Sequence, residues 1–169
     1  MAHLVMLCTG NAARSVMAGA LMDTDLDVIV TTRGTHVVEG MPMSLRTQSA
    51  LAALGVRNHK HRSRQLTADD LRQADLVVAM AREHVEYVRK RHPAAAPRTA
   101  TLKRLVRDLP RTTGTLSERV AALELDMVVL EHWEDVDDPA GGDEVVFHEC
   151  AAQINGLLEQ LAPVFRDAE

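Results

Sequence analysis

Eight residues near the amino terminus combine a nucleophile with groups that bind anions. They are Cys8-Thr9-Gly10-Asn11-Ala12-Ala13-Arg14-Ser15. An apolar run, 3–7, precedes them and a second apolar stretch, 17–22, follows, which predicts a strand, a loop and a helix in that order. Backbone N–H groups at the start of a helix point toward such a loop, and the helix dipole also favours negative charge there. We therefore expect an anion site in which Cys8 is ionised at neutral pH and nucleophilic.

Two interpretations of Cys8 compete. A lone cysteine after a buried strand is usually a small core residue, because free cysteines are among the most buried residue types. Here, however, Arg14 follows six residues later, with Ser15 directly after it. Gly10 lets a ligand approach the backbone and Asn11 tolerates a left-handed conformation, so the octet contains each part needed to hold a tetrahedral oxyanion over a thiolate. We favour the functional interpretation.

The composition restricts the class of protein. The chain of 169 residues fits one domain covering 1–169, and 46% of its residues are hydrophobic, which is enough for a buried core. Its net charge of −5 disfavours nucleic acid as a partner. Cys8 and Cys150 are the only cysteines, which gives neither a disulfide framework nor a zinc-binding spacing. With no signal peptide or membrane-spanning run, we expect a cytoplasmic protein with no membrane partner.

Strand patterns alternate with helix patterns along the chain. Ser44 before the helix 45–54, and Thr67 with Asp70 at the start of a short helix, are capping signals. Such alternation predicts a three-layer α/β/α fold, a flavodoxin-like doubly wound arrangement, with a four-stranded parallel sheet. Ligands bind at the carboxyl ends of the strands in these sheets, which is where Cys8 lies. The expected strands are 3–7, 27–32, 74–80 and 98–102, and the other expected helices are 17–22, 68–73, 83–91, 102–109, 117–132 and 143–164.

Three segments allow more than one interpretation. The charged run 57–64 is either a solvated surface or a basic rim that attracts phosphorylated substrates. The apolar spacing of 117–132, with Ser117 as cap, predicts a helix that either packs on the core or covers the active-site rim. Cys150 lies on the core side of the last helix, together with Val146, and we expect it to be a buried structural thiol.

The octet resembles the Cys-x5-Arg-Ser/Thr phosphate loop of phosphatases, and its position at the amino terminus resembles the low-molecular-weight protein tyrosine phosphatase family. Arg33-Gly34-Thr35, Gly40-Met41-Pro42 and the strand 74–80 agree with that family. The segment 111–135 is longer than the family leads us to expect, which suggests an extra helical segment there. The resemblance implies the phosphatase-I-like form of the predicted fold.

The same resemblance implies roles for individual residues. Cys8 would attack phosphorus and form a phosphocysteine, while Arg14 and Ser15 would stabilise the phosphoryl group and the thiolate. Asp138, directly before a proline, would protonate the leaving oxygen and then activate water, with Asp137 as the rival acid. No metal or other cofactor is implied. The phosphate would be bound by the backbone N–H groups of Thr9, Gly10, Asn11, Ala12, Ala13 and Arg14.

The implied function is a phosphomonoester hydrolase that acts on phosphotyrosine in proteins and releases inorganic phosphate. Arsenate reduction, which needs a relay of further cysteines, and a catalytically weak phosphate-binding module are the alternatives. Two positions depart from the family. Ala13 replaces a second cysteine, so that Cys8 is either oxidised irreversibly or protected by a nearby Cys150. Ala140 replaces an aromatic residue that would flank a phosphotyrosine ring.

Overall fold

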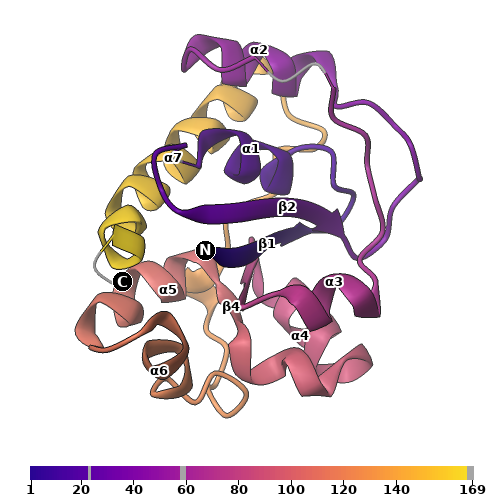
Figure 1. Cartoon of the computed structure of the whole chain (residues 1–169). Coiled ribbons are helices and arrows are strands. Elements are labelled where there is room, and N and C mark those ends of the chain that lie inside the picture. Colours follow the sequence, from indigo (N-terminus) through magenta and orange to yellow (C-terminus); the bar gives the residue numbers. More distant parts are fainter. Residues whose placement is uncertain (23, 58–59, 167–169) are drawn as a thin grey trace.

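A four-stranded parallel sheet forms the centre of the fold (Figure 1). The computed structural model describes residues 1–22, 24–57 and 60–166. The strands are β1 (Ala2–Cys8), β2 (Val28–Gly34), β3 (Leu76–Ala79) and β4 (Thr99–Thr101), in the order β2-β1-β3-β4. The predicted parallel sheet is therefore confirmed.

The register brings the carboxyl ends of the two longest strands together. Cys8, the last residue of β1, pairs with Gly34, the last residue of β2. On its other side β1 pairs with β3, so the chain order reverses between these two strands. A reversal of this kind leaves a crevice beyond the strand ends. The loop that follows Cys8 occupies that position.

Helices cover both faces of the sheet, as predicted. Leu4 and Met6 of β1 belong to the core shared with α1, α5 and α7, whereas Val5 and Leu7 pack on the opposite face with α3 and α4. This alternation buries β1 on both sides, which is typical of a central parallel strand. The helices are α1 (Arg14–Leu21), α2 (Leu45–Ala53), α3 (Ala68–Gln73), α4 (Arg82–Arg91), α5 (Leu102–Asp108), α6 (Leu116–Ala121) and α7 (Glu144–Arg166). Short 3-10 helices are η1 (Pro93–Arg98), η2 (Leu109–Arg111) and η3 (His132–Glu134).

The predicted caps are present. The Ser44 hydroxyl accepts a hydrogen bond from the Thr47 N–H at 3.2 Å at the start of α2. At the start of α3, Thr67 and Asp70 form a reciprocal capping box. Each cap satisfies backbone N–H groups that have no partner within the helix.

The helix expected over 117–132 is much shorter than its apolar spacing suggested. It is α6, which begins at Leu116 with Thr115 as its cap rather than Ser117, and which ends at Ala121. Glu124 then adopts a left-handed conformation with φ 46°. Arg89 Nη2 donates to the Leu125 and Val128 carbonyl oxygens, which replaces the hydrogen bonds that a continued helix would supply. Met127, which contributes to the apolar spacing of 117–132, is 77% exposed.

The last helix agrees with the sequence prediction, but one residue that was expected on its core side is exposed. Cys150 is buried on α7 as expected, whereas Val146 is 40% exposed near the start of the helix. None of the helices in the described part of the chain combines the length and apolar character needed to cross a membrane.

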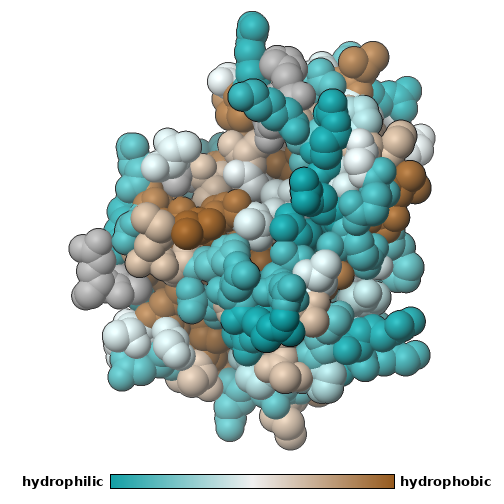
Figure 2. Space-filling view, turned by 45° about the vertical axis from the view of Figure 1, so that its right-hand side comes forward, coloured by the Kyte–Doolittle hydropathy of each residue, from teal (hydrophilic) through white to brown (hydrophobic). Residues whose placement is uncertain are grey.

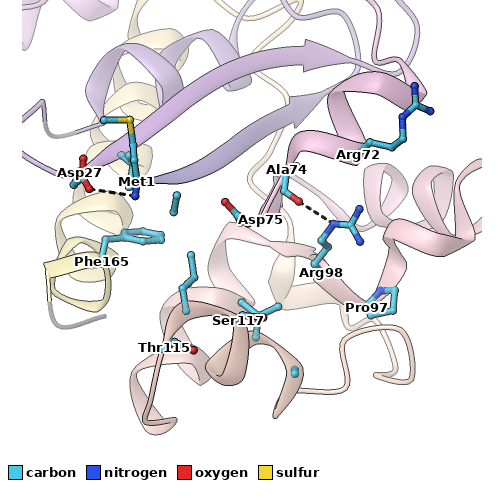
Figure 3. A pocket seen from close by; sticks show the side chains of 15 residues that line it. Met1, Asp27, Arg72, Ala74, Asp75, Pro97, Arg98, Thr115, Ser117 and Phe165 are labelled. Carbon is cyan, nitrogen blue, oxygen red and sulfur yellow. Dashed lines mark hydrogen bonds and ion pairs between the residues drawn. The ribbon is translucent and has the colours of Figure 1, made fainter. Parts of the chain in front are cut away.

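A cavity of about 740 Å³ opens at the amino ends of the strands, at the opposite edge of the sheet from Cys8 (Figure 3). The Met1 ammonium lies 3.3 Å from the Asp27 carboxylate there. Arg98 donates from its guanidinium to the Leu71 and Ala74 carbonyl oxygens, at 2.7 and 2.9 Å. These charged groups are therefore already paired within the protein, and the cavity does not gather groups toward one ligand.

Candidate active site

The octet forms a loop between the end of β1 and the start of α1, as predicted. Cys8 and Arg14 are each 3% exposed, so both side chains are held inside the protein. No described residue accepts a hydrogen bond from the backbone N–H groups of Thr9 to Arg14. Buried N–H groups normally have partners, and a row of free ones at a helix start is suited to phosphate oxygens.

Asn11 holds this loop in its curved form. It is fully buried and has φ 50°, which confirms the expected left-handed conformation. Its Nδ2 donates to Ser15 Oγ and its Oδ1 accepts from the Arg64 N–H, both at 2.9 Å. Its backbone oxygen contacts Ser63 Oγ at 2.7 Å and His61 Nε2 at 2.8 Å. Hydrogen bonds of this number fix a backbone conformation that few residues adopt.

Ser15 is oriented toward the nucleophile. Its Oγ lies 2.9 Å from Cys8 Sγ. Since the same oxygen accepts a hydrogen bond from Asn11 Nδ2, the Ser15 hydroxyl hydrogen is free to point at the sulfur. A hydrogen bond in that direction stabilises a thiolate.

Gly34 allows the end of β2 to approach the loop closely. A Cβ atom at Gly34 would lie 2.5 Å from the Thr9 carbonyl oxygen and 2.9 Å from the Asn11 nitrogen. No side chain fits at that separation, so Gly34 serves close packing of β2 against the loop. Gly10 differs, because a Cβ there would meet no protein atom within 4 Å, and that space is left for a ligand.

His84, which the sequence did not single out, supports the loop from α4. Its Nδ1 accepts the Ala81 N–H at 3.1 Å, and its Nε2 lies 2.9 Å from Thr9 Oγ1. The imidazole proton is therefore on Nε2 and is donated to Thr9. Burial, together with the nearby Arg14 charge, lowers the pKa of His84 to about 3. The side chain is a neutral, fixed hydrogen-bond donor, and its only sequence signal was its position just past a strand end.

Arg14 connects the loop to the segment that carries the expected acid. Its Nη1 donates to the Val136 carbonyl oxygen at 2.9 Å. Its Nη2 lies 3.6 Å from the Asp138 carboxylate and 4.0 Å from that of Glu83. The Asp138 side chain is 51% exposed, so it can meet a ligand at the mouth of the loop. In the described part of the chain, no ion pair joins Arg14 to the Asp137 carboxylate.

Ion pairs hold Glu134 and Asp135, the two residues that begin the segment leading to Asp138. Glu134 is fully buried and accepts two hydrogen bonds from Arg104, both at 2.7 Å, and one from Thr101 at 2.9 Å. Burial alone would raise the pKa of Glu134, but these hydrogen bonds bring it below its usual value, so the side chain is ionised. Asp135 pairs with Arg82 at 3.0 Å in the next position. Sequence patterns gave no sign of these pairs, because the partners lie far apart along the chain.

Cys150 lies behind the acid-bearing segment rather than at the mouth of the loop. Its Sγ is 3.9 Å from the Asp137 carbonyl oxygen. Burial raises the pKa of Cys150 to about 11, so it is a neutral thiol at physiological pH. Both cysteines are free and belong to the same buried cluster. A buried neutral thiol is a poor resolving group for an oxidised Cys8.

Comparison with known proteins identifies similar chains and folds. The family model described as low molecular weight phosphotyrosine protein phosphatase matches residues 3–118. The chain is 29% identical to the protein-arginine-phosphatase of Geobacillus stearothermophilus over 162 residues, which is 95% of this chain and 93% of the relative. It is 31% identical to low molecular weight protein-tyrosine phosphatase A of Mycobacterium tuberculosis, covering 94% of this chain and 88% of the relative. The structure of the YwlE arginine phosphatase from Geobacillus stearothermophilus matches with a TM-score of 0.77 and 28% identity, covering 96% of this chain and 92% of that chain.

The neutral state of His84 makes stability depend on pH. Below pH 6.5 the unfolded chain protonates this histidine while the folded chain does not, so folding stability falls as the pH drops from 6.5 toward 3. For a folded pKa of about 3, the loss between pH 7 and pH 5 is about 2 kcal/mol. Replacing His84 with Asn should remove that part of the slope in urea unfolding. His61, whose pKa burial also lowers, remains in both proteins.

The matched control is His92→Asn, at the other end of α4, which should keep the wild-type slope. Equal slopes in the wild-type and His84→Asn proteins would show that His84 is not held neutral by burial.

Proposed function

Since the chain belongs to the low molecular weight phosphotyrosine protein phosphatase family, we propose that it hydrolyses phosphorylated side chains of proteins through a phosphocysteine intermediate. The observation that carries the proposal is the 2.9 Å contact between Cys8 Sγ and Ser15 Oγ inside a loop of free backbone N–H groups. A thiolate at this place faces the phosphorus of any phosphate that the loop binds.

In the first step the Cys8 sulfur attacks phosphorus, and the bond from phosphorus to the leaving atom breaks. The three equatorial oxygens carry the developing charge, and they are bound by the loop N–H groups and the planar guanidinium of Arg14. Asp138 transfers its proton to the leaving atom. Arg14 is already oriented for this task by its hydrogen bond to the Val136 carbonyl oxygen.

In the second step a water molecule attacks phosphorus from the side that the leaving group has vacated. Asp138, now a carboxylate, accepts the proton of that water as the sulfur–phosphorus bond breaks. Inorganic phosphate leaves and the thiolate of Cys8 forms again, stabilised by Ser15. None of these steps uses a metal ion or an organic cofactor.

Two phosphorylated side chains fit the mouth of the loop differently. Phosphotyrosine, the first expectation, needs apolar walls, and Ala140 supplies no ring. The exposed side chain of Met41 is a candidate wall, because its carbonyl accepts the N–H of Ser63, which in turn binds Asn11. That arrangement favours phosphotyrosine only modestly.

Phosphoarginine is favoured by charge. Its phosphate is attached to a guanidinium cation, which would enter the mouth beside the Glu83 carboxylate, with the Asp138 carboxyl group next to the leaving nitrogen. The carboxyl groups of Glu83 and Asp138 lie within 4.0 Å of Arg14 Nη2, and they are 65% and 51% exposed. We therefore propose phosphoarginine in proteins as the preferred substrate and phosphotyrosine as the second candidate.

The other functions considered fit the site less well. Arsenate reduction needs a second reactive cysteine, and Cys150 is buried with a raised pKa. A binding module without turnover would not need an acid, yet Asp138 lies at the mouth beside Arg14.

Replacing Asp138 with Asn should show whether this residue protonates the leaving group. Loss of the acid should lower kcat/KM for phenyl phosphate by about 100-fold or more and kcat/KM for p-nitrophenyl phosphate much less, because p-nitrophenolate leaves without a proton. Steady-state kinetics on the two esters measure the difference. The matched control is Asp137→Asn, which should leave both rates nearly unchanged. An equal or larger effect from Asp137→Asn would move the acid by one residue.

Peptides of one sequence carrying either phosphoarginine or phosphotyrosine test the substrate. We expect kcat/KM to be about 10-fold higher for phosphoarginine, and replacement of Glu83 with Gln to reduce that advantage about 3-fold, as for a single exposed charge pair. Replacement of Glu86, one turn further along α4, is the control and should change neither rate. Preference for phosphotyrosine, unaffected by Glu83→Gln, would contradict the assignment.

A further inference from the structure

We propose that a basic segment beside the phosphate loop, Lys60–Arg64, binds acidic side chains that lie next to the phosphorylated residue of the protein substrate. The inference rests on the proposed function, since it concerns how the same site selects its substrates. Asn58 and His59, which belong to the charged run of the sequence, lie outside the described residues.

Two alternate residues of the segment, His61 and Ser63, hydrogen-bond to the phosphate loop. His61 Nε2 and Ser63 Oγ contact the Asn11 carbonyl oxygen at 2.8 and 2.7 Å, and Ser63 is 1% exposed. The backbone then pairs with two neighbours, because Gly34 N–H donates to the Arg64 oxygen at 3.0 Å and Ser63 N–H to the Met41 oxygen at 2.8 Å. Burial alternates in the same way, because Ser63 is buried while Arg62 and Arg64 on either side of it are exposed. The side chains that do not anchor the segment therefore point outward at the edge of the loop.

Those outward side chains are the cationic ones. Lys60, Arg62 and Arg64 are all exposed. Figure 2 shows hydrophilic side chains over much of the side of the molecule that carries this segment. Because the anchoring bonds come from His61, Ser63 and the Arg64 backbone, the cationic ends are not needed to hold the segment in place and can contact a ligand.

Within the part of the chain that the structure describes, these cations have no carboxylate partner. Among the described residues, no Asp or Glu oxygen forms an ion pair with Lys60, Arg62 or Arg64, whereas Arg33 and Arg104 pair with carboxylates at 2.8 and 2.7 Å. Arg62 donates only to the carbonyl oxygen of His61, its own neighbour. The carboxylate of Glu39 is engaged by the residue that follows the segment, because its Oε1 accepts the Gln65 N–H at 2.7 Å.

Charges of both signs lie near the phosphate loop. Glu83 and Asp138 lie within 4.0 Å of Arg14 Nη2, whereas His61, between Lys60 and Arg62, contacts the Asn11 carbonyl oxygen. Acidic side chains next to the phosphorylated residue would be attracted to the cations of the basic segment. The chain as a whole has a net charge of −5. An uncompensated basic segment next to the catalytic loop is therefore suited to recognising substrates at this site rather than to binding polyanions in general.

The test uses two phosphopeptides that differ only in having Asp or Ser on either side of the phosphorylated residue, built on whichever phosphorylated residue the chain hydrolyses. The wild-type protein should show about 10-fold higher kcat/KM on the acidic peptide at low salt, and the advantage should shrink as salt is raised. The double variant Lys60→Gln/Arg62→Gln should lose most of that advantage and keep its rate on p-nitrophenyl phosphate.

The control is Lys90→Gln/Arg91→Gln, which removes the same charge at the far end of α4 and should behave as the wild type. Equal rates of wild type on the two peptides, or equal losses in both double variants, would overturn the inference. So would inhibition by a single-stranded oligonucleotide that depends on Lys60 and Arg62 without any peptide preference, which would assign the segment to nucleic acid. Failure of the wild type to hydrolyse p-nitrophenyl phosphate and both peptides would refute the proposed function itself.

Discussion

The hydrogen bonds of Asn11 are the constraint on which the site depends. This buried residue adopts a left-handed conformation within a loop whose N–H groups, from Thr9 to Arg14, have no hydrogen-bond acceptor among the described residues. Its side chain also fixes Ser15, whose hydroxyl then faces Cys8, and its carbonyl anchors the basic segment through Ser63. The proposed nucleophile, the proposed phosphate-binding loop and the basic segment are therefore arranged by one residue. The conformation is unfavourable in isolation, and the surrounding hydrogen bonds offset that cost.

Arg14 joins this loop to the second half of the site. One nitrogen of its guanidinium holds the Val136 carbonyl and another faces the Asp138 carboxylate, so the residue that would bind phosphate also positions the acid. The backbone that leads to Val136 and Asp138 is held in place because Glu134 and Arg104 form a buried ion pair. A buried pair of this kind adds little net stability, but breaking it leaves an uncompensated charge, so it fixes one conformation of this backbone. The Glu134–Arg104 pair thus fixes the backbone that leads to Asp138, whose half-exposed carboxylate reaches solvent.

The sequence was informative where structure is local. A strand, a loop and a helix follow one another within 21 residues, and the caps at Ser44 and Thr67 need only their immediate neighbours. Prediction failed where distant residues decide. The helix expected over 117–132 ends at Ala121, since Arg89 takes carbonyl groups that lie beyond that end. His84 and Gly34 support the loop through contacts with residues far away in the sequence, which spacing cannot reveal.

The central claim is that Cys8 accepts the phosphoryl group. The most direct measurement is the mass of acid-quenched Asp138→Asn protein mixed with p-nitrophenyl phosphate, followed by peptide mapping. The good leaving group lets the first step proceed, while the missing base slows the second, so the intermediate should accumulate. The account predicts one added phosphoryl group on the peptide that contains Cys8. Steady release of p-nitrophenol with no adduct, or an adduct on another residue such as Cys150, would contradict it.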